Sequence, residues 1–451
     1  MSRFGALDLE RVRARVSEAP VTSISGRVVR AGGLAVEALM PAISVGAACE
    51  IELPSGRLLA ECVGFNGERA ILVPIGDVRG LRGGAAVFPL EHALTVPVSD
   101  GLLGRVVTPT MEPLDGRGDI AAARRAQAQL HAQPPNPMAR QRIAQPFVTG
   151  VRTIDALLTC GAGQRVGIMA GAGVGKSVLL GMLARHCEAD IIVVGLIGER
   201  GREVREFVER DLGPEGLARS IVIVATGDRP PLERVHAALA ATAVAEHYRA
   251  AGKRVLLLMD SLTRVAMALR EIGLAAEEPP TSKGYPPSVF AALPKLVERA
   301  GNDAGPGGIT AFYTVLVEGD DLADPVADCA RAALDGHIVL SRKLAGAGHF
   351  PAIDVLESVS RVMLDVTTAQ QRATAARARD ALAALRESAD LIDIGAYQAG
   401  SNRRVDFALS VQEQLRNFAR QQPEHGSSYD DTRAQLDQAL VPPRAPRSAH
   451  A

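Results

Sequence analysis

The chain has no tryptophan, and only 3% of its 451 residues are aromatic. A platform on which the bases of single-stranded nucleic acid could stack therefore has little to be built from. A formal net charge of −1 also differs from the strongly basic balance that is typical of nucleic-acid-binding proteins. We predict that nucleic acid is not a partner.

Paired cysteines and long apolar runs are missing as well. The five cysteines lie far apart without a CxxC pair, which is typical of reduced intracellular thiols. Because no uncharged stretch reaches about eighteen residues, we expect neither a membrane span nor a signal peptide, and a protein of the cytoplasm. What is present is 47% hydrophobic and 22% charged residues, a composition that predicts a soluble globular protein of several domains.

The first third of the chain contains three segments with different residue patterns. Residues 1–20 place apolar side chains at helical spacing among charges, which fits either a solvated leader or a partner-binding segment. Residues 21–98 hold short β-rich runs punctuated by glycine and proline, and predict a small β-barrel or sandwich. Residues 99–150 end in a proline-rich stretch and predict a linker region leading into the core.

The rest of the chain predicts an α/β domain followed by helices. Within 151–365, short and continuously apolar strands alternate with helical stretches, as a parallel sheet covered on both faces requires. Residues 366–435 are rich in alanine, leucine and arginine, and predict a helical C-terminal domain. The remaining residues, 436–451, include PPRAPR and predict a flexible tail.

The stretch GAGVGKS follows the apolar run RVGIMA and precedes a helical pattern, which is the setting of a phosphate-binding loop. Lys176 would reach the β and γ phosphates of a nucleoside triphosphate, and Ser177 would coordinate Mg²⁺. Ala170 stands where the usual pattern begins with glycine, but the later glycines of the loop are kept. The predicted nucleotide contacts are Ala172, Gly173, Val174, Gly175, Lys176, Ser177 and Val178.

Two carboxylates follow predicted strands. Asp260 ends the run KRVLLLMD, at the edge of an α/β sheet where ligands bind, and either holds Mg²⁺ or caps the next helix. Glu199 follows IIVVGLIG on an exposed turn near the same edge. A glutamate there would suit a general base for hydrolysis, although acidic residues in turns are usually only solvated.

Taken together, long motifs of this chain resemble the type III secretion ATPases, which comprise flagellar export ATPases and their injectisome counterparts and are relatives of rotary ATP synthase subunits. The resemblance runs from about residue 27 to about residue 415. It implies a central RecA-like P-loop domain, an N-terminal small β-barrel and a C-terminal helical domain. The motifs that carry it are AGAGVGKSVLLGM, VVGLIGERGREVREF, LLLMDSLTR, EPPTSKGYPPSVFAALPKLVERAG, VLVEGDDLADPVAD, DGHIVLSRKLA and FPAIDVLESVSRVM.

The resemblance also implies roles for single residues. Glu199 matches the catalytic base, and Arg200 and Arg264 match basic residues near the γ phosphate. Arg361 matches an arginine finger that reaches into the neighbouring subunit's site, unless it is an arginine in a surface ion pair. Phe350 matches an aromatic that lies against adenine, unless it is a core residue.

One position departs from the family. Glu277 replaces a glycine that relatives place in a loop near the centre of the ring. Its charge either tunes how subunits couple or lies in solvent.

The function implied by the resemblance is a homohexameric, Mg²⁺-dependent ATPase at the inner-membrane export apparatus. It would release cargo from chaperones and promote delivery to the export gate. Expected partners are a stator or regulator protein at the N-terminal segment, a central stalk protein and chaperone–cargo complexes.

Three alternative functions compete with this one. One is a catalytic subunit of a rotary F/V-type ATP synthase, and another is a non-catalytic subunit of the same complex. Non-catalytic subunits typically lack the carboxylate base that Glu199 would supply. A hexameric RNA translocase is the third, and the scarcity of aromatic residues disfavours it.

Overall fold

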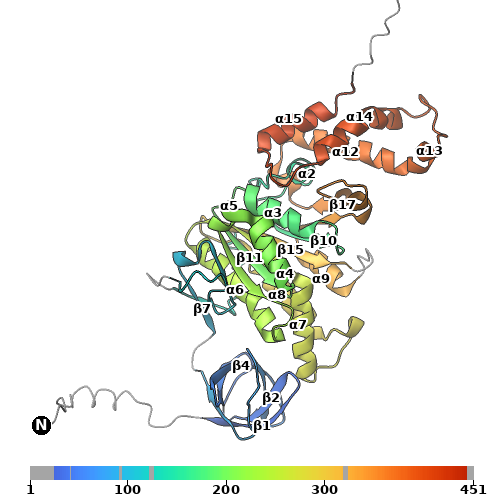
Figure 1. Cartoon of the computed structure of the whole chain (residues 1–451). Coiled ribbons are helices and arrows are strands. Elements are labelled where there is room, and N and C mark those ends of the chain that lie inside the picture. The colour runs from blue at the N-terminus through green and yellow to red at the C-terminus, as the bar shows by residue number, and fades with distance from the viewer. Residues whose placement is uncertain (1–24, 41, 91–93, 121–125, 318–323, 444–451) are drawn as a thin grey trace, which may run out of the picture. The chain divides into compact units, whose positions relative to one another are not determined.

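The computed structural model describes residues 25–40, 42–90, 94–120, 126–317 and 324–443 (Figure 1). The chain divides into two compact units, Met1–Ala93 and Leu94–Ala451. The expected partner-binding segment 1–20 lies outside the described residues, as does the end of the expected tail.

The first unit is a closed antiparallel barrel, as the β-rich runs predict, with strand order β1-β2-β5-β4-β3-β6. Alternating side chains such as Val36, Ile51 and Leu72 point inward and form its core. Its strands are β1 (Gly26–Gly32), β2 (Ala35–Leu39), β3 (Ala48–Leu53), β4 (Gly56–Asn66), β5 (Arg69–Pro74) and β6 (Ala86–Pro89).

The second unit is built on a nine-stranded sheet in the order β17-β16-β10-β15-β13-β11-β12-β8, with β14 paired to β15 outside this path. Neighbours from β16 to β8 run parallel, and β17 is antiparallel to β16. The strands are β8 (Arg105–Val107), β10 (Arg165–Ala170), β11 (Ile191–Ile197), β12 (Ser220–Ala225), β13 (Arg254–Asp260), β14 (Gly301–Asn302), β15 (Gly308–Leu316), β16 (Gly336–Leu340) and β17 (Ile353–Ser360).

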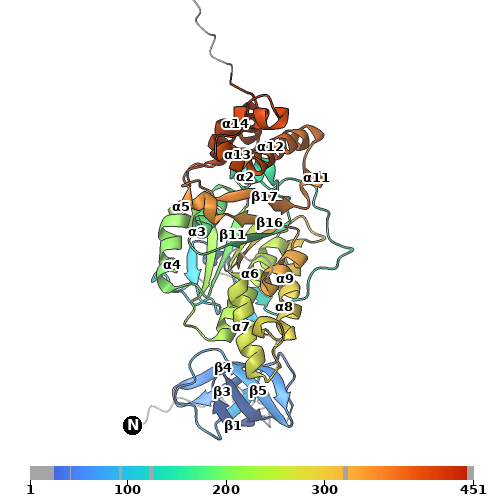
Figure 2. The same cartoon turned by 90° about the vertical axis from the view of Figure 1, so that its right-hand side faces the viewer.

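Helices cover both faces of this sheet, which is why its central strands are apolar throughout. One hydrophobic core joins the sheet to α3, and a second joins it to α6, α7, α8 and α9. Figure 2 shows α3 and α8 on opposite sides of the sheet. The helices are α2 (Arg152–Leu157), α3 (Lys176–His186), α4 (Gly201–Glu206), the π-helix η2 (Phe207–Leu212), α5 (Gly213–Ala218), α6 (Pro231–Ala250), α7 (Leu262–Ala275), α8 (Pro287–Glu298), α9 (Pro325–Ala333) and α10 (Arg342–Gly346), with the 3₁₀ turns η1 (Asp100–Leu102) and η3 (Ser282–Gly284).

The chain after β17 is helical, as expected. Its helices pack against α2 and extend the same core as α3, with Ala378, Ala408 and Leu436 among the buried residues. They are α11 (Met363–Val366), α12 (Ala369–Glu387), α13 (Ala389–Asp393), α14 (Arg403–Ala419) and α15 (Tyr429–Ala439). No helix within the described residues is both long and apolar enough to cross a bilayer.

The domain limits in the structure differ from the expected ones at three places. β7 (Thr95–Val98) falls in the range expected for the barrel, but it pairs with β9 (Ala126–Gln129) in the second unit. The range 99–150 is not only a linker, because β8 pairs with β12 and extends the central sheet. α15 runs to Ala439 and so occupies the start of the expected tail, because Leu436 and Ala439 are buried in the core.

The backbone at the end of α7 favours glycine at position 277, which is the residue that the resemblance implies there. The Glu277 N–H donates to the Leu274 carbonyl and the Glu278 N–H donates to the Gly273 carbonyl, which are the two bonds of a Schellman motif. The motif requires a left-handed residue, and Glu277 has a φ of 62° with an exposed side chain. A residue other than glycine is strained there.

Replacing Glu277 with glycine is therefore expected to raise the free energy of unfolding by up to about 1 kcal/mol. Chemical denaturation of the wild-type and variant proteins measures the change. Glu278→Gly is the matched control, and it should lower stability because the Glu278 carboxylate accepts hydrogen bonds from Ser288. A Glu277→Gly variant less stable than the wild type would contradict this explanation.

Candidate active site

The predicted phosphate loop lies between a buried strand and a long helix. β10 ends at Ala170, and α3 begins at Lys176 with Gly175 as its N-cap. Gly173 and Gly175 have φ values of 76° and 90°, so these two positions need glycine. Ala170 is still part of the strand and pairs with both neighbouring strands, so alanine is tolerated where the usual pattern has glycine.

The structure brings together three of the predicted residues at the carboxyl edge of the sheet. Lys176 Nζ lies 3.2 Å from Glu199 Oε1 and 2.5 Å from Asp260 Oδ1. All three side chains are largely buried, with exposed fractions of 13%, 14% and 4%. One cation therefore holds two carboxylates at the mouth of the phosphate loop.

The strand order explains this convergence. β10, β13 and β11 run parallel, so their carboxyl ends lie at one edge. Asp260 is the last residue of β13, and Glu199 follows β11 after a left-handed turn at Gly198. Thr314 of β15, between them and β10, donates to Asp260 Oδ1 at 2.6 Å. Thr314 has no local signal in the sequence, because only the strand order places it beside Asp260.

Asp260 does not cap the next helix, which was the alternative role for it. Ser261 is the N-cap of α7, and its hydroxyl accepts a hydrogen bond from the Arg264 N–H. The Asp260 side chain instead faces Lys176 and Thr314. Its carboxylate is thus directed at the predicted nucleotide site.

Burial and charge shift two pKa values in the site. Burial lowers the pKa of the Lys176 amine, but Asp260 and Glu199 outweigh it, so the pKa is raised and the amine stays charged. Burial, the nearby Asp260 charge and a hydrogen bond with Glu203 outweigh the lowering effect of Lys176 and raise the pKa of Glu199 to about 7. The Glu203 bond acts in this direction because ionised Glu203 accepts from protonated Glu199.

These shifts predict the pH dependence of hydrolysis by a Glu199 general base. The ionised carboxylate is the active form, so kcat/KM should fall about tenfold per pH unit below a pKa of about 7 and level off above it. In Glu203→Gln, the amide can donate to ionised Glu199, so the acid limb should move to lower pH. Steady-state rates at several pH values test this, and an acid limb at an unchanged pH in Glu203→Gln would contradict it.

Arg264 lies beside the turn that carries Glu199. Its aliphatic chain packs so closely on Gly198 that a Cβ there would lie 2.9 Å from Arg264 Cβ. The Arg264 Nε is buried without a hydrogen-bond partner among the described residues. The prediction for Arg200 has no such support, because its side chain is 82% exposed and pairs with Glu203 at 3.3 Å.

Phe350 is not a core residue, since 43% of it is exposed. It precedes β17, and its ring lies 3.4 Å from where a Cβ of Gly175 would be. Its carbonyl accepts a hydrogen bond from the Gln421 N–H at 3.0 Å. The ring is thus held against the start of α3, and the predicted contact with adenine stays a prediction.

Arg361 lies at the opposite edge of the sheet. β17 is antiparallel to β16, so Ser360 pairs with Gly336 at the amino end of β16. The phosphate loop begins at the carboxyl end of β10, and six residues of strand span about 17 Å. The exposed Arg361 guanidinium donates to the Arg331 carbonyl at 3.2 Å and forms no ion pair within the described residues. It therefore does not reach the Lys176 site of its own chain.

Models of three known domains match this chain in order. The β-barrel domain of the ATP synthase alpha/beta family matches residues 21–91, and the nucleotide-binding domain of that family matches residues 150–360. The T3SS EscN ATPase C-terminal domain matches residues 367–438. Together with the loop and its carboxylates, these matches define a P-loop nucleotide-binding protein of the ATP synthase alpha/beta class.

Relatives place the chain more narrowly. It is 50% identical to the flagellum-specific ATP synthase of Bacillus subtilis (91% of this chain, 94% of the relative) and 49% identical to the type 3 secretion system ATPase of Sinorhizobium fredii (91% and 90%). The structure of the assembled ATPase EscN from enteropathogenic E. coli aligns with a TM-score of 0.87 at 43% identity, covering 92% of this chain and 100% of the chain in that structure. EscN in complex with its central stalk EscO aligns with a TM-score of 0.84 at 44% identity, over 92% and 100%. The chain belongs to the family of type III secretion and flagellum-specific ATPases.

Proposed function

We propose that this protein is the ATPase of a type III protein export apparatus and hydrolyses ATP at sites completed between adjacent copies of the chain. The proposal rests on where the two halves of the catalytic site lie in one chain. Lys176, Glu199 and Asp260 meet at one edge of the sheet, and Arg361 lies at the other. A second copy is needed to bring both halves to one nucleotide.

The chain's own residues suggest how the site works. The Lys176 ammonium, now shared by two carboxylates, would turn to the β and γ phosphates. Glu199 would then be free to orient the attacking water and accept its proton. Arg264, whose Nε has no partner among the described residues, would face the γ phosphate. These steps make the site a hydrolase rather than only a binding site.

The donors at this edge fit Mg²⁺. Asp260 offers a buried carboxylate, and Ser177 offers a hydroxyl in the first turn of α3. Hard oxygen donors of this kind are what Mg²⁺ prefers beside nucleotide phosphates. Asp260 and Ser177 would hold the ion, which when bound neutralises charge on the phosphate oxygens.

The relatives support the assembly and favour export over a rotary synthase. EscN is described as assembled and in complex with its central stalk EscO, which supports a homohexameric ring around a stalk protein for this chain. The match of residues 367–438 to the T3SS ATPase C-terminal domain favours export. A regulator at the N-terminal segment, chaperone–cargo complexes, the inner-membrane export gate and a cytoplasmic location remain predictions from the resemblance.

If sites form only between copies, specific activity depends on assembly. Phosphate release per chain is expected to rise with protein concentration, because dilution converts rings into chains without a neighbouring Arg361. Phosphate release in the presence of Mg²⁺, measured beside the molecular mass at each concentration, tests this. A constant specific activity from a verified monomer would contradict the proposal.

A further inference from the structure

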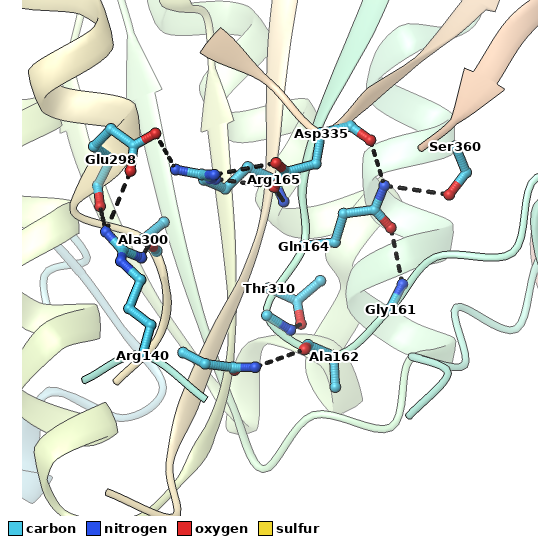
Figure 3. A network of polar contacts seen from close by, with 12 residues as sticks. Arg140, Gly161, Ala162, Gln164, Arg165, Glu298, Ala300, Thr310, Asp335 and Ser360 are labelled. Atoms are coloured by element: carbon cyan, nitrogen blue, oxygen red, sulfur yellow. Dashed lines mark hydrogen bonds and ion pairs between the residues drawn. The ribbon is translucent and has the colours of Figure 1, made fainter. Parts of the chain in front are cut away.

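Gln164 is a fully buried amide at the amino end of β10, and every polar atom of its side chain is used. Its Oε1 accepts a hydrogen bond from the Gly161 N–H at 2.8 Å. Its Nε2 donates to the Asp335 carbonyl at 2.9 Å and to the Ser360 hydroxyl at 3.3 Å. Figure 3 shows Gln164 between Gly161 and the pair formed by Asp335 and Ser360. These bonds join the amino end of β10 to the residue before β16 and to the last residue of β17.

The two acceptors of this amide are also the supports of Arg361. The Asp335 carbonyl that accepts from Gln164 accepts from the Arg361 N–H as well, at 3.0 Å. Ser360 is the residue before Arg361, and its hydroxyl also donates to the Thr159 carbonyl at 2.8 Å. Gln164 therefore holds the backbone of Arg361 through a shared carbonyl and through the preceding side chain.

Asp335 itself is held rigidly. Arg165, the first residue of β10, donates from Nε and Nη2 to the two Asp335 carboxylate oxygens at 2.9 and 3.1 Å (Figure 3). Such a bidentate pair fixes the direction of the carboxylate as well as its distance. The Asp335 carbonyl is thus a fixed point, and Gln164 and Arg361 both bind to it.

We propose that Gln164 is a positioning residue for Arg361 and so acts on the nucleotide site of the neighbouring copy. The inference rests on the proposed function, in which Arg361 completes that neighbouring site. The whole of β10 separates Gln164 from the phosphate loop of its own chain. Losing the amide should therefore damage the neighbour's turnover and spare nucleotide binding by the same chain.

The variant Gln164→Met removes the amide while keeping a similar volume. Turnover is expected to fall by about 10²-fold, because a displacement of about 1 Å of a catalytic group has that effect. The affinity for a fluorescent ATP analogue should stay within a factor of about two of the wild-type value. Thr242→Val is the matched control, since among the described residues the buried Thr242 hydroxyl bonds only within α6, to the Ala238 carbonyl. It should keep wild-type turnover.

Mixed rings separate this role from a merely structural one. Lys176→Ala chains have an intact Arg361, so co-assembly with them should restore activity to Gln164→Met chains. Arg361→Ala chains lack that residue and should restore none. Rescue by Arg361→Ala chains but not by Lys176→Ala chains would overturn the proposal, because the defect would lie in the variant's own site. Rescue by neither partner, or full activity of Gln164→Met alone, would overturn it too.

A replacement variant and a separate mixture of two variants complete the experiment. If Gln164→Met does not assemble, Ser360→Ala replaces it in the same pairings, because it removes one acceptor of the amide from a partly exposed position. The mixture of Lys176→Ala with Arg361→Ala tests the proposed function separately. Failure of that mixture alone would reject action between copies, whereas its success with failure of the Gln164→Met pairings would reject only the role of Gln164.

Discussion

Replacing Glu199 with glutamine is expected to lower kcat for ATP hydrolysis by about 10²- to 10⁴-fold, the range that general-base catalysis supplies. The amide keeps the size of the side chain but cannot accept the proton of the attacking water. Nucleotide affinity should be unchanged or higher, because Lys176 loses one of its two carboxylate partners and turns more readily to phosphate. Steady-state phosphate release and binding of a fluorescent nucleotide measure the two effects.

The matched control for this variant is Glu206→Gln. Glu206 is the last residue of α4, the helix that follows Glu199, and forms a surface ion pair with Arg202 at 2.7 Å. Such exposed pairs contribute little, so turnover and stability should stay close to wild type. Equal turnover in Glu199→Gln and Glu206→Gln would remove Glu199 as the base.

The second large effect is expected at Arg361. An arginine finger stabilises the charge that spreads over the transferring phosphoryl group, and its loss costs about 10³- to 10⁵-fold in kcat, or about 4 to 7 kcal/mol. Arg361→Ala should therefore nearly abolish hydrolysis. The fold should persist, because the exposed guanidinium donates a hydrogen bond only to the Arg331 carbonyl among the described residues. Phosphate release by the assembled variant measures the loss.

Arg386→Ala is the control for this second variant. Arg386 is also exposed and pairs with Asp354 and Glu357 of β17, but it belongs to α12. Its loss should cost about 1 kcal/mol of stability at most and leave kcat unchanged. A normal rate in Arg361→Ala rings of verified size would rule out a finger at this position.

The strands of the fold were predictable because their pattern is local. Runs such as IIVVGLI are apolar without interruption, as a doubly covered parallel sheet requires, and the structure confirms that sheet. β8 was not predictable, because a strand of only three residues carries almost no periodicity. Its place is fixed by pairing with β12, more than a hundred residues later in the chain.

The residues of the candidate site also fall into those with a local sequence signal and those without one. The glycine-rich loop and the strand-end Asp260 have local signals, and the structure places Lys176 against Asp260 and Glu199 as those signals imply. Thr314 and Gln164 have none, because each matters through neighbours that only the strand order supplies. The position of Arg361 at the far edge likewise follows from the direction of β17.

The central claim is that ATP is hydrolysed between adjacent copies of this chain. The most direct test is phosphate release from co-assembled Lys176→Ala and Arg361→Ala chains, each inactive alone. The mixture should regain activity, because some interfaces then pair an intact phosphate loop with an intact Arg361. No phosphate release above that of the separate variants, in rings proven to contain both chains, would contradict the account.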